Sequence, residues 1–128
     1  MGQSVSMNWL SFTTCAGTDL FGCPGSELNK QYNEMKSANC VNCDKYFHCQ
    51  GNYNAVKKCK SRSNAAGIAK KISDCREKAQ GSSTADSRAD QVANLFGRNG
   101  GDCAKKYLCK NNCKWSPTLR TCSKINCP

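Results

Sequence analysis

The chain has little of the apolar material that forms a protein core. Leu, Ile, Val and Phe together number 17 of its 128 residues, about 13%, and a share below roughly 20% with a high net charge is typical of disordered chains. Twelve cysteines oppose that interpretation, because cross-links stabilise small folds whose cores are thin. We therefore predict a small disulfide-rich protein, α-rich with short helices and irregular loops, and with up to six disulfides.

Catalytic residue types are also scarce. The single histidine, His48, precedes a cysteine that we expect in a disulfide, which favours a neutral structural role over a catalytic one. A glycosidase needs two carboxylates about 5 to 9.5 Å apart, whereas Glu27, Glu34 and Glu77 fall on the expected solvent faces of helices. The sequence has no glycine-rich phosphate loop of the Walker type. We therefore predict that the protein is not an enzyme, with no catalytic, cofactor-binding or metal-binding residues and no cofactor.

Signals for export are missing from the sequence as well. No apolar run approaches the length of a membrane span, the N-terminus lacks the pattern of a secretory signal, and none of the 13 asparagines lies in an N-x-[ST] glycosylation site. Instead the first residues, MGQSVS, fit the N-myristoylation pattern with Gly2 as the acceptor. These features predict synthesis in the cytoplasm, followed by oxidation of the cysteines.

The charge of the chain is strongly positive. Its 19 Lys and Arg against 9 Asp and Glu give a formal charge of +10, which favours acidic protein surfaces or an anionic membrane as partners. Lys57, Lys58, Lys70 and Lys71 are the side chains that we expect to dock. The lysines form no long run, so a surface adapted for solubility explains the charge equally well. A nucleic-acid partner is not favoured, because aromatic residues next to cystines more often pack against the sulfur than stack on bases.

The cysteines fall into two clusters separated by 27 residues. Their positions are Cys15, Cys23, Cys40, Cys43, Cys49, Cys59, Cys75, Cys103, Cys109, Cys113, Cys122 and Cys127. This spacing predicts an N-terminal cysteine-rich lobe at 1–80, a linker and helix at 81–102 and a C-terminal cysteine-rich lobe at 103–128, together forming one compact unit. Zinc is an alternative for individual cysteines, because Cys40-x2-Cys43 and Cys109-x3-Cys113 have ligand spacing. Disulfides are favoured because no second Cys-x2-Cys pair exists.

Three segments have apolar residues at helical spacing. They are 26–38, with Leu28, Tyr32 and Met35; 64–79, with Ile68, Ile72 and Cys75; and 85–96, with Ala85, Ala89, Val92 and Phe96. In the second of these helices we expect Lys70, Lys71 and Arg76 to face solvent. The third helix would join the two lobes.

One stretch resembles the central part of a peritrophin-type chitin-binding module. The stretch is CDKYFHCQGNYNAVKKC at 43–59, and the matching positions are Cys43, Tyr46, Phe47, Cys49, Gly51 and Cys59. The resemblance implies a β-rich module whose aromatic rings stack on N-acetylglucosamine. Under this alternative the protein is secreted, and Tyr46, Phe47 and Trp115 are the carbohydrate-binding residues.

A second resemblance is one of type. The MGQSVS start, the missing signal and the twelve cysteines resemble the disulfide-rich minor capsid and virion proteins of large DNA viruses, which are oxidised without entering the secretory pathway. This resemblance implies a non-enzymatic structural protein located in the virion, whose partners are other capsid or virion proteins. It is the leading hypothesis from sequence; the alternatives are the secreted chitin-binding module and a basic defence protein or toxin.

Overall fold

The computed structural model describes residues 8–38, 40, 43–60, 64–81 and 84–126. The α-helices are α1 (Trp9–Ala16), α2 (Cys23–Ser37), α3 (Asp44–Lys57), α4 (Ala65–Gln80) and α5 (Ala85–Arg98). Shorter turns of helix are η1 (Gly17–Phe21), η2 (Ala104–Leu108) and η3 (Cys109–Asn111), and the strands are β1 (Cys113–Ser116) and β2 (Thr121–Lys124). The predicted fold class, an α-rich protein with short helices and disulfides, is confirmed.

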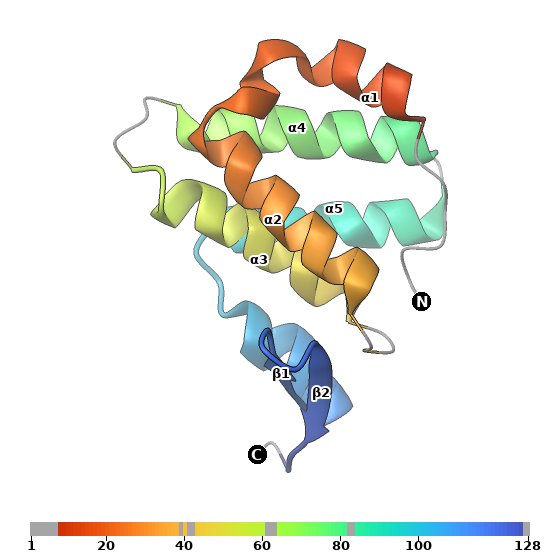
Figure 1. Cartoon of the computed structure of the whole chain (residues 1–128), viewed down its shortest axis with the longest axis vertical. Coiled ribbons are helices and arrows are strands. Elements are labelled where there is room, and N and C mark those ends of the chain that lie inside the picture. Colours follow the sequence, from red (N-terminus) through yellow and green to blue (C-terminus); the bar gives the residue numbers. More distant parts are fainter. Residues whose placement is uncertain (1–7, 39, 41–42, 61–63, 82–83, 127–128) are drawn as a thin grey trace.

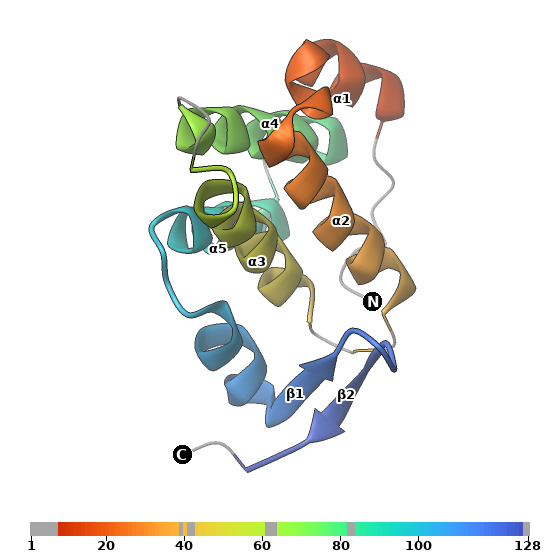
Figure 2. The ribbon, with the colours of Figure 1, turned by 60° about the vertical axis from the view of Figure 1, so that its left-hand side comes forward.

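The helices form a bundle with one appended layer at each end (Figure 1). Helix α3 packs between α2 and α5, and α4 contacts α2, α3 and α5. Helix α1 lies across α4 as an outer layer, while the hairpin of β1 and β2 lies at the opposite end of the molecule, as both views show (Figures 1 and 2). Apart from this hairpin, the described residues form no sheet.

The helices predicted from apolar spacing are α2, α4 and α5. Leu28 and Met35 of α2 are buried, as are Ile72 and Cys75 of α4. Helix α5 begins at the N-cap Thr84, whose side-chain oxygen accepts a hydrogen bond from the Ser87 amide at 3.0 Å; a cap of this kind satisfies a backbone donor that the first turn leaves unpaired. Apolar spacing therefore specifies α2 and α4, whereas α5 forms where it was predicted but buries a different face, because Val92 of the predicted stripe is 61% exposed and Ala93 and Gly97 are buried.

Helix α3 contradicts the prediction for 43–59, which is helical and not a β-rich module. Its buried residues lie all around the helix and include Asp44, Asn52 and Asn54 as well as Phe47 and Ala55. An element covered on several sides shows no apolar stripe, because its polar residues bury against neighbours rather than facing water. The other fold had been suggested by a resemblance that rested on the cysteines, the aromatic pair Tyr46 and Phe47, and Gly51.

Helix α1 and the hairpin were not predicted. Helix α1 is capped by Asn8, whose Oδ1 accepts the Ser11 amide at 3.1 Å, and it buries Phe12 and Ala16 against the bundle. The hairpin is antiparallel and pairs Trp115 with Cys122. Within the described part of the chain, no helix is long and apolar enough to cross a membrane.

Candidate functional site

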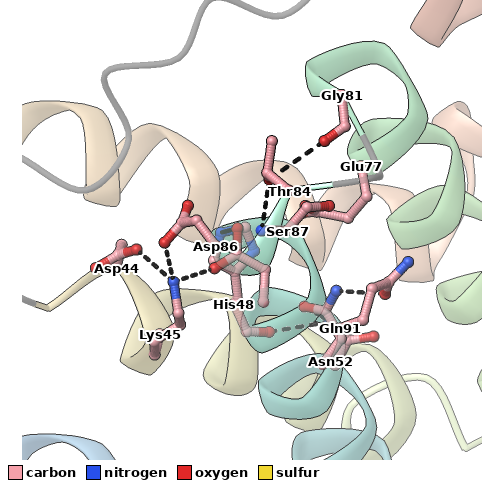
Figure 3. A network of polar contacts seen from close by, with 12 residues as sticks. Asp44, Lys45, His48, Asn52, Glu77, Gly81, Thr84, Asp86, Ser87 and Gln91 are labelled. Carbon is pink, nitrogen blue, oxygen red and sulfur yellow. Dashed lines mark hydrogen bonds and ion pairs between the residues drawn. The ribbon is translucent and has the colours of Figure 1, made fainter.

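A layer of polar side chains is buried where α3, α4 and α5 meet (Figure 3). The Nζ atom of Lys45 contacts Oδ2 of Asp44 at 3.0 Å, Oδ1 of Asp86 at 2.7 Å and Oδ1 of Asp90 at 2.6 Å. Burial lowers the pKa of Lys45, but the hydrogen bonds to these carboxylates outweigh it, so the pKa lies above its ordinary value. The charged ammonium thus occupies the space between three carboxylates that could otherwise hold a metal ion.

His48 and Asp90 form the second contact of this layer, with Nε2 of His48 3.3 Å from Oδ2 of Asp90. Burial, together with the positive charge of Arg76, lowers the pKa of His48 to about 4. Burial raises the pKa of Asp90 to about 7 despite its hydrogen bond from Lys45. At neutral pH His48 is therefore uncharged, in agreement with the structural role predicted for it.

Glu77 and Arg76 lie inside this layer, although the sequence predicted both on the solvent face of their helix. Glu77 is 1% exposed, its Oε1 accepts a hydrogen bond from the Ser87 hydroxyl at 2.7 Å, and burial raises its pKa. Arg76 is 7% exposed, and its guanidinium lies 3.7 Å from the centroid of the Tyr32 ring. The prediction was wrong because α4 is covered by α1 and α2 and also by α5, so it has more than one buried face.

Asn52 connects the same three helices through its amide group. Its Oδ1 accepts hydrogen bonds from the Ser73 hydroxyl at 3.2 Å and from Nη1 of Arg98 at 2.9 Å, and its Nδ2 donates to Oδ1 of Asn94 at 3.0 Å. Both Asn52 and Asn94 are 1% exposed. Because a buried polar group without partners is costly, this arrangement favours one pairing of α3 with α4 and α5.

The chemistry available inside the bundle is limited by space. A cavity beside the polar layer has a volume of about 20 Å³ and is lined by residues that include His48, Asn52, Arg76 and Glu77. This volume accommodates one water molecule and no organic ligand. The polar layer therefore serves the structure of the bundle.

The opposite shifts of His48 and Asp90 predict two variants with opposite pH dependence. Because the pKa of Asp90 is raised in the folded protein, Asp90 stabilises the fold at low pH, and this stabilisation is lost as the pH rises through about 7. Because the pKa of His48 is lowered, His48 stabilises the fold above pH 6.5, and this stabilisation is lost as the pH falls through about 4. In the native protein the two effects oppose each other between about pH 4 and pH 7. Relative to the native protein, Asp90→Asn should therefore lose stability on acidification and His48→Gln should gain it.

Urea unfolding across this pH range measures the effect. We expect each variant's stability relative to the native protein to change by on the order of 3 kcal/mol, in opposite directions. Parallel pH profiles for the two variants would contradict the assigned protonation states.

The aromatic residues predicted to bind carbohydrate lie together in the core. The rings of Phe47 and Trp115 meet edge to face with centroids 5.1 Å apart, and these residues are 2% and 8% exposed. Tyr46 is partly buried against Phe47, and the Trp115 indole donates a hydrogen bond to Oε1 of Glu34 at 3.0 Å. Phe47 and Trp115 therefore offer no ring face to a sugar, because the core covers them.

The predicted disulfide candidates occur mostly in pairs. The structure joins Cys15–Cys75, Cys23–Cys59, Cys40–Cys43, Cys49–Cys103 and Cys113–Cys122, and Cys109 is also disulfide-bonded. Cys127 and the lipidation candidate Gly2 lie outside the described residues. Three of these pairs tie distant parts of the chain together: α1 to α4, the start of α2 to the residues after α3, and α3 to the start of η2.

The lysines predicted to dock on a partner mostly contact groups of their own chain. Nζ of Lys70 lies 2.6 Å from Asp74, that of Lys71 lies 3.0 Å from Asp19, and that of Lys58 lies 3.8 Å from Glu27. The fourth, Lys57, lies over the ring of Tyr53. The positive charge of Lys58, Lys70 and Lys71 is thus largely balanced by carboxylates of the same chain.

Sequence reasoning missed the apolar outer surface of α1 and η1, which we call the apolar end of the molecule. It is defined by Trp9, Leu10 and Phe21, which are 61%, 75% and 87% exposed. The run Trp9–Phe12 could have indicated it, since three of its four residues are large and apolar. Below it a shallow pocket is lined by Cys15 and Cys75 and by Lys70, Lys71 and Lys78.

Comparison with known proteins identifies the family. The family model described as "Serum amyloid A protein" matches residues 22–114. The chain belongs to the serum amyloid A family. Serum amyloid A-3 of Mesocricetus auratus is 43% identical over 100 residues, which cover 76% of this chain and 75% of the relative. Serum amyloid A-3 of Mus musculus is 42% identical over the same shares, and serum amyloid A of Anas platyrhynchos is 44% identical over 59% of this chain and 61% of the relative.

Membership of the serum amyloid A family corrects the two resemblances drawn from the sequence. The chain is neither a virion or capsid protein nor a peritrophin-type chitin-binding module. The predictions of capsid, virion and carbohydrate partners, which followed from these resemblances, are therefore also wrong. None of the three relatives is named as an enzyme, which agrees with the prediction of a non-enzymatic protein. Their names place them in serum, an extracellular fluid, which agrees with the secreted alternative.

The match to serum amyloid A also divides the structure. Residues 22–114 contain α2 to α5 and the whole polar layer, whereas α1, η1 and nearly all of the hairpin lie outside the matched range. The polar layer therefore belongs to the family part of the fold. The apolar end lies outside the matched range.

Proposed function

We propose that the chain is an extracellular, non-enzymatic protein that binds phospholipid surfaces through its apolar end. The observation that carries the proposal is the exposure of Trp9, Leu10 and Phe21 on the outermost layer of the molecule. Exposed aromatic and leucine side chains on an outer helix are characteristic of proteins that lie in a lipid interface. The serum origin of the relatives supports the extracellular location.

The packing of α1 on α4 leaves no space in the protein core for Trp9, Leu10 and Phe21. Phe12 and Ala16 already fill the face of α1 that packs on α4, at 1% and 0% exposure. The disulfides Cys15–Cys75 and Cys23–Cys59 hold α1 and the start of α2 on the bundle. The apolar end is therefore preformed, and binding to lipid costs little ordering of the chain.

Charge favours the same orientation. Lys78 lines the pocket beside the apolar end together with Lys70 and Lys71, whose charges are paired with Asp74 and Asp19, and the chain as a whole carries a charge of +10. Lysines next to an inserted apolar face place their ammonium groups at the level of lipid phosphates. Apolar burial supplies the affinity, at about 1 to 2 kcal/mol for each inserted side chain, and Lys78 orients the layer.

Co-sedimentation with phosphatidylcholine vesicles tests the proposal. We expect Leu10→Ser with Phe21→Ser to weaken binding by at least about tenfold, since tenfold corresponds to 1.4 kcal/mol and two apolar anchors are lost. Leu119→Ser is the matched control, because Leu119 is equally apolar and 70% exposed but lies in the turn of the hairpin, at the far end of the molecule. Equal binding by the double variant and the control would refute the proposal.

A further inference from the structure

Four cysteines from three separate segments converge at the end of the bundle that carries the hairpin. Cys40 and Cys43 lie between the end of α2 and the start of α3, Cys113 begins β1 and Cys122 lies in β2. All four Sγ atoms lie within 4.8 Å of one another, and those of Cys40 and Cys113 are 4.0 Å apart. We call these residues the cysteine quartet.

The cysteine quartet has the dimensions of a tetrathiolate metal site. A Zn–S bond of about 2.3 Å in a tetrahedron places neighbouring sulfurs about 3.8 Å apart, close to the distance between Cys40 and Cys113. From the sequence, zinc was the alternative on Cys40-x2-Cys43 and Cys109-x3-Cys113, and it was not favoured because no second Cys-x2-Cys pair exists. The antiparallel hairpin supplies that pair in space, with Cys113 and Cys122 on neighbouring strands.

The surroundings of the quartet are those of a structural metal site. Cys40, Cys43 and Cys113 are 8%, 2% and 4% exposed, and apolar side chains that include Met35, Phe47, Leu108 and Trp115 pack around them. In the sheet, Lys124 stands opposite Cys113. A neighbouring lysine favours the thiolate, which is the form that binds metal.

The two cysteine pairs of the quartet also close much shorter loops than the three long-range disulfides. Cys15–Cys75, Cys23–Cys59 and Cys49–Cys103 close loops of 60, 36 and 54 residues. The pairs Cys40–Cys43 and Cys113–Cys122 close loops of only 3 and 9 residues, which constrain the unfolded chain less, and neither pair joins the hairpin to the bundle. One metal ion bound by all four sulfurs would join them.

We propose that Cys40, Cys43, Cys113 and Cys122 are the four ligands of a structural zinc ion. The ion binds in place of the disulfides Cys40–Cys43 and Cys113–Cys122 while the reduced chain folds, so no disulfide has to be reduced: four thiols release four protons and become thiolates, and the divalent ion gains four sulfur ligands. The ion links the hairpin to the segment between α2 and α3. The remaining disulfides hold the family part of the fold and α1.

Metal content and thiol reactivity test the zinc site together. The full chain is reduced, refolded in a glutathione redox buffer that contains zinc ions, and analysed by native mass spectrometry. We expect one zinc per chain, no thiol that reacts with an alkylating reagent, and four reactive thiols after a chelator removes the metal. Peptide mapping should place these thiols at the quartet. A metal-free protein in which the four cysteines remain as disulfides before and after chelation would overturn the proposal.

Two variants locate the site. Cys113→Ser with Cys122→Ser should bind no zinc, whereas Cys15→Ser with Cys75→Ser removes a disulfide at the opposite end of the molecule and should bind one ion. Cobalt is a second readout that does not depend on the stability of a variant, because a tetrahedral tetrathiolate site gives the unaltered chain intense visible absorption with this ion. Zinc retained by the Cys113 and Cys122 variant, or cobalt bound without that absorption, would also overturn the proposal.

Discussion

Lys45→Met is expected to destabilise the protein by about 3 to 5 kcal/mol, because it removes the ammonium group that three carboxylates share. The side chains of Asp44 and Asp90 are only 10% and 6% exposed, so water cannot replace the lost contacts. Methionine has a similar length and retains the packing of the aliphatic stem, which isolates the loss of charge. Urea unfolding at neutral pH measures the change.

Lys70→Met is the matched control for this prediction. Nζ of Lys70 lies 2.6 Å from Asp74, but its side chain is 62% exposed, and pairs of this kind contribute between about 0 and 1 kcal/mol. The deficit of Lys45→Met should also shrink as the pH falls through the pKa of Asp90, about 7, since a protonated carboxyl no longer needs the ammonium. Equal losses in the two variants would contradict the central position that we assign to Lys45.

Gly97→Ala is expected to cost at least about 3 kcal/mol, which makes it the second large effect. Gly97 is buried in α5 against the backbone of α3. A Cβ atom built on it would lie 2.8 Å from the carbonyl carbon of Cys49 and closer still to the carbonyl oxygen. Both obstacles are backbone atoms of a packed helix, so the two helices would have to separate. Thermal and urea unfolding of the variant measure the loss.

The same substitution at Gly67 is the control, with the opposite expectation. Gly67 lies in α4, where the three atoms nearest to an added Cβ all belong to the side chain of Asn64, which can rotate away. Alanine is a better helix former than glycine by up to about 1 kcal/mol, so Gly67→Ala should leave stability unchanged or raise it. A Gly97→Ala protein as stable as Gly67→Ala would contradict the close approach of α3 and α5.

The parts of the fold that the sequence predicted are those determined locally. Helices α2 and α4 have apolar residues at helical spacing, such as Leu28 and Met35 or Ile68 and Ile72, and this spacing is visible in a single segment. Helix α3 could not be found in this way, because its packing against α2 on one side and α5 on another removes any single apolar stripe. Its polar residues are satisfied by helices far away in the chain.

The candidate sites depend even more on tertiary structure. Glu77 and Arg76 look like solvent-facing residues in the sequence, and only the packing of α5 and the Tyr32 ring over α4 buries them. The cysteine quartet has the same character, since Cys113 and Cys122 become neighbours of Cys40 and Cys43 only through the hairpin. For the apolar end, the residues Trp9 and Leu10 were visible, but whether they would face the core or solvent was not.

Fluorescence of Trp9 during lipid binding tests most directly the claim that the apolar end meets the phospholipid surface. The chain has two tryptophans, and the other, Trp115, is 8% exposed and hydrogen-bonded to Glu34, so only Trp9 should change its surroundings. On addition of phosphatidylcholine vesicles, we predict a blue shift of the emission in the native protein and none in Trp9→Phe. No shift in the native protein, or an equal shift in Trp9→Phe, would contradict the account.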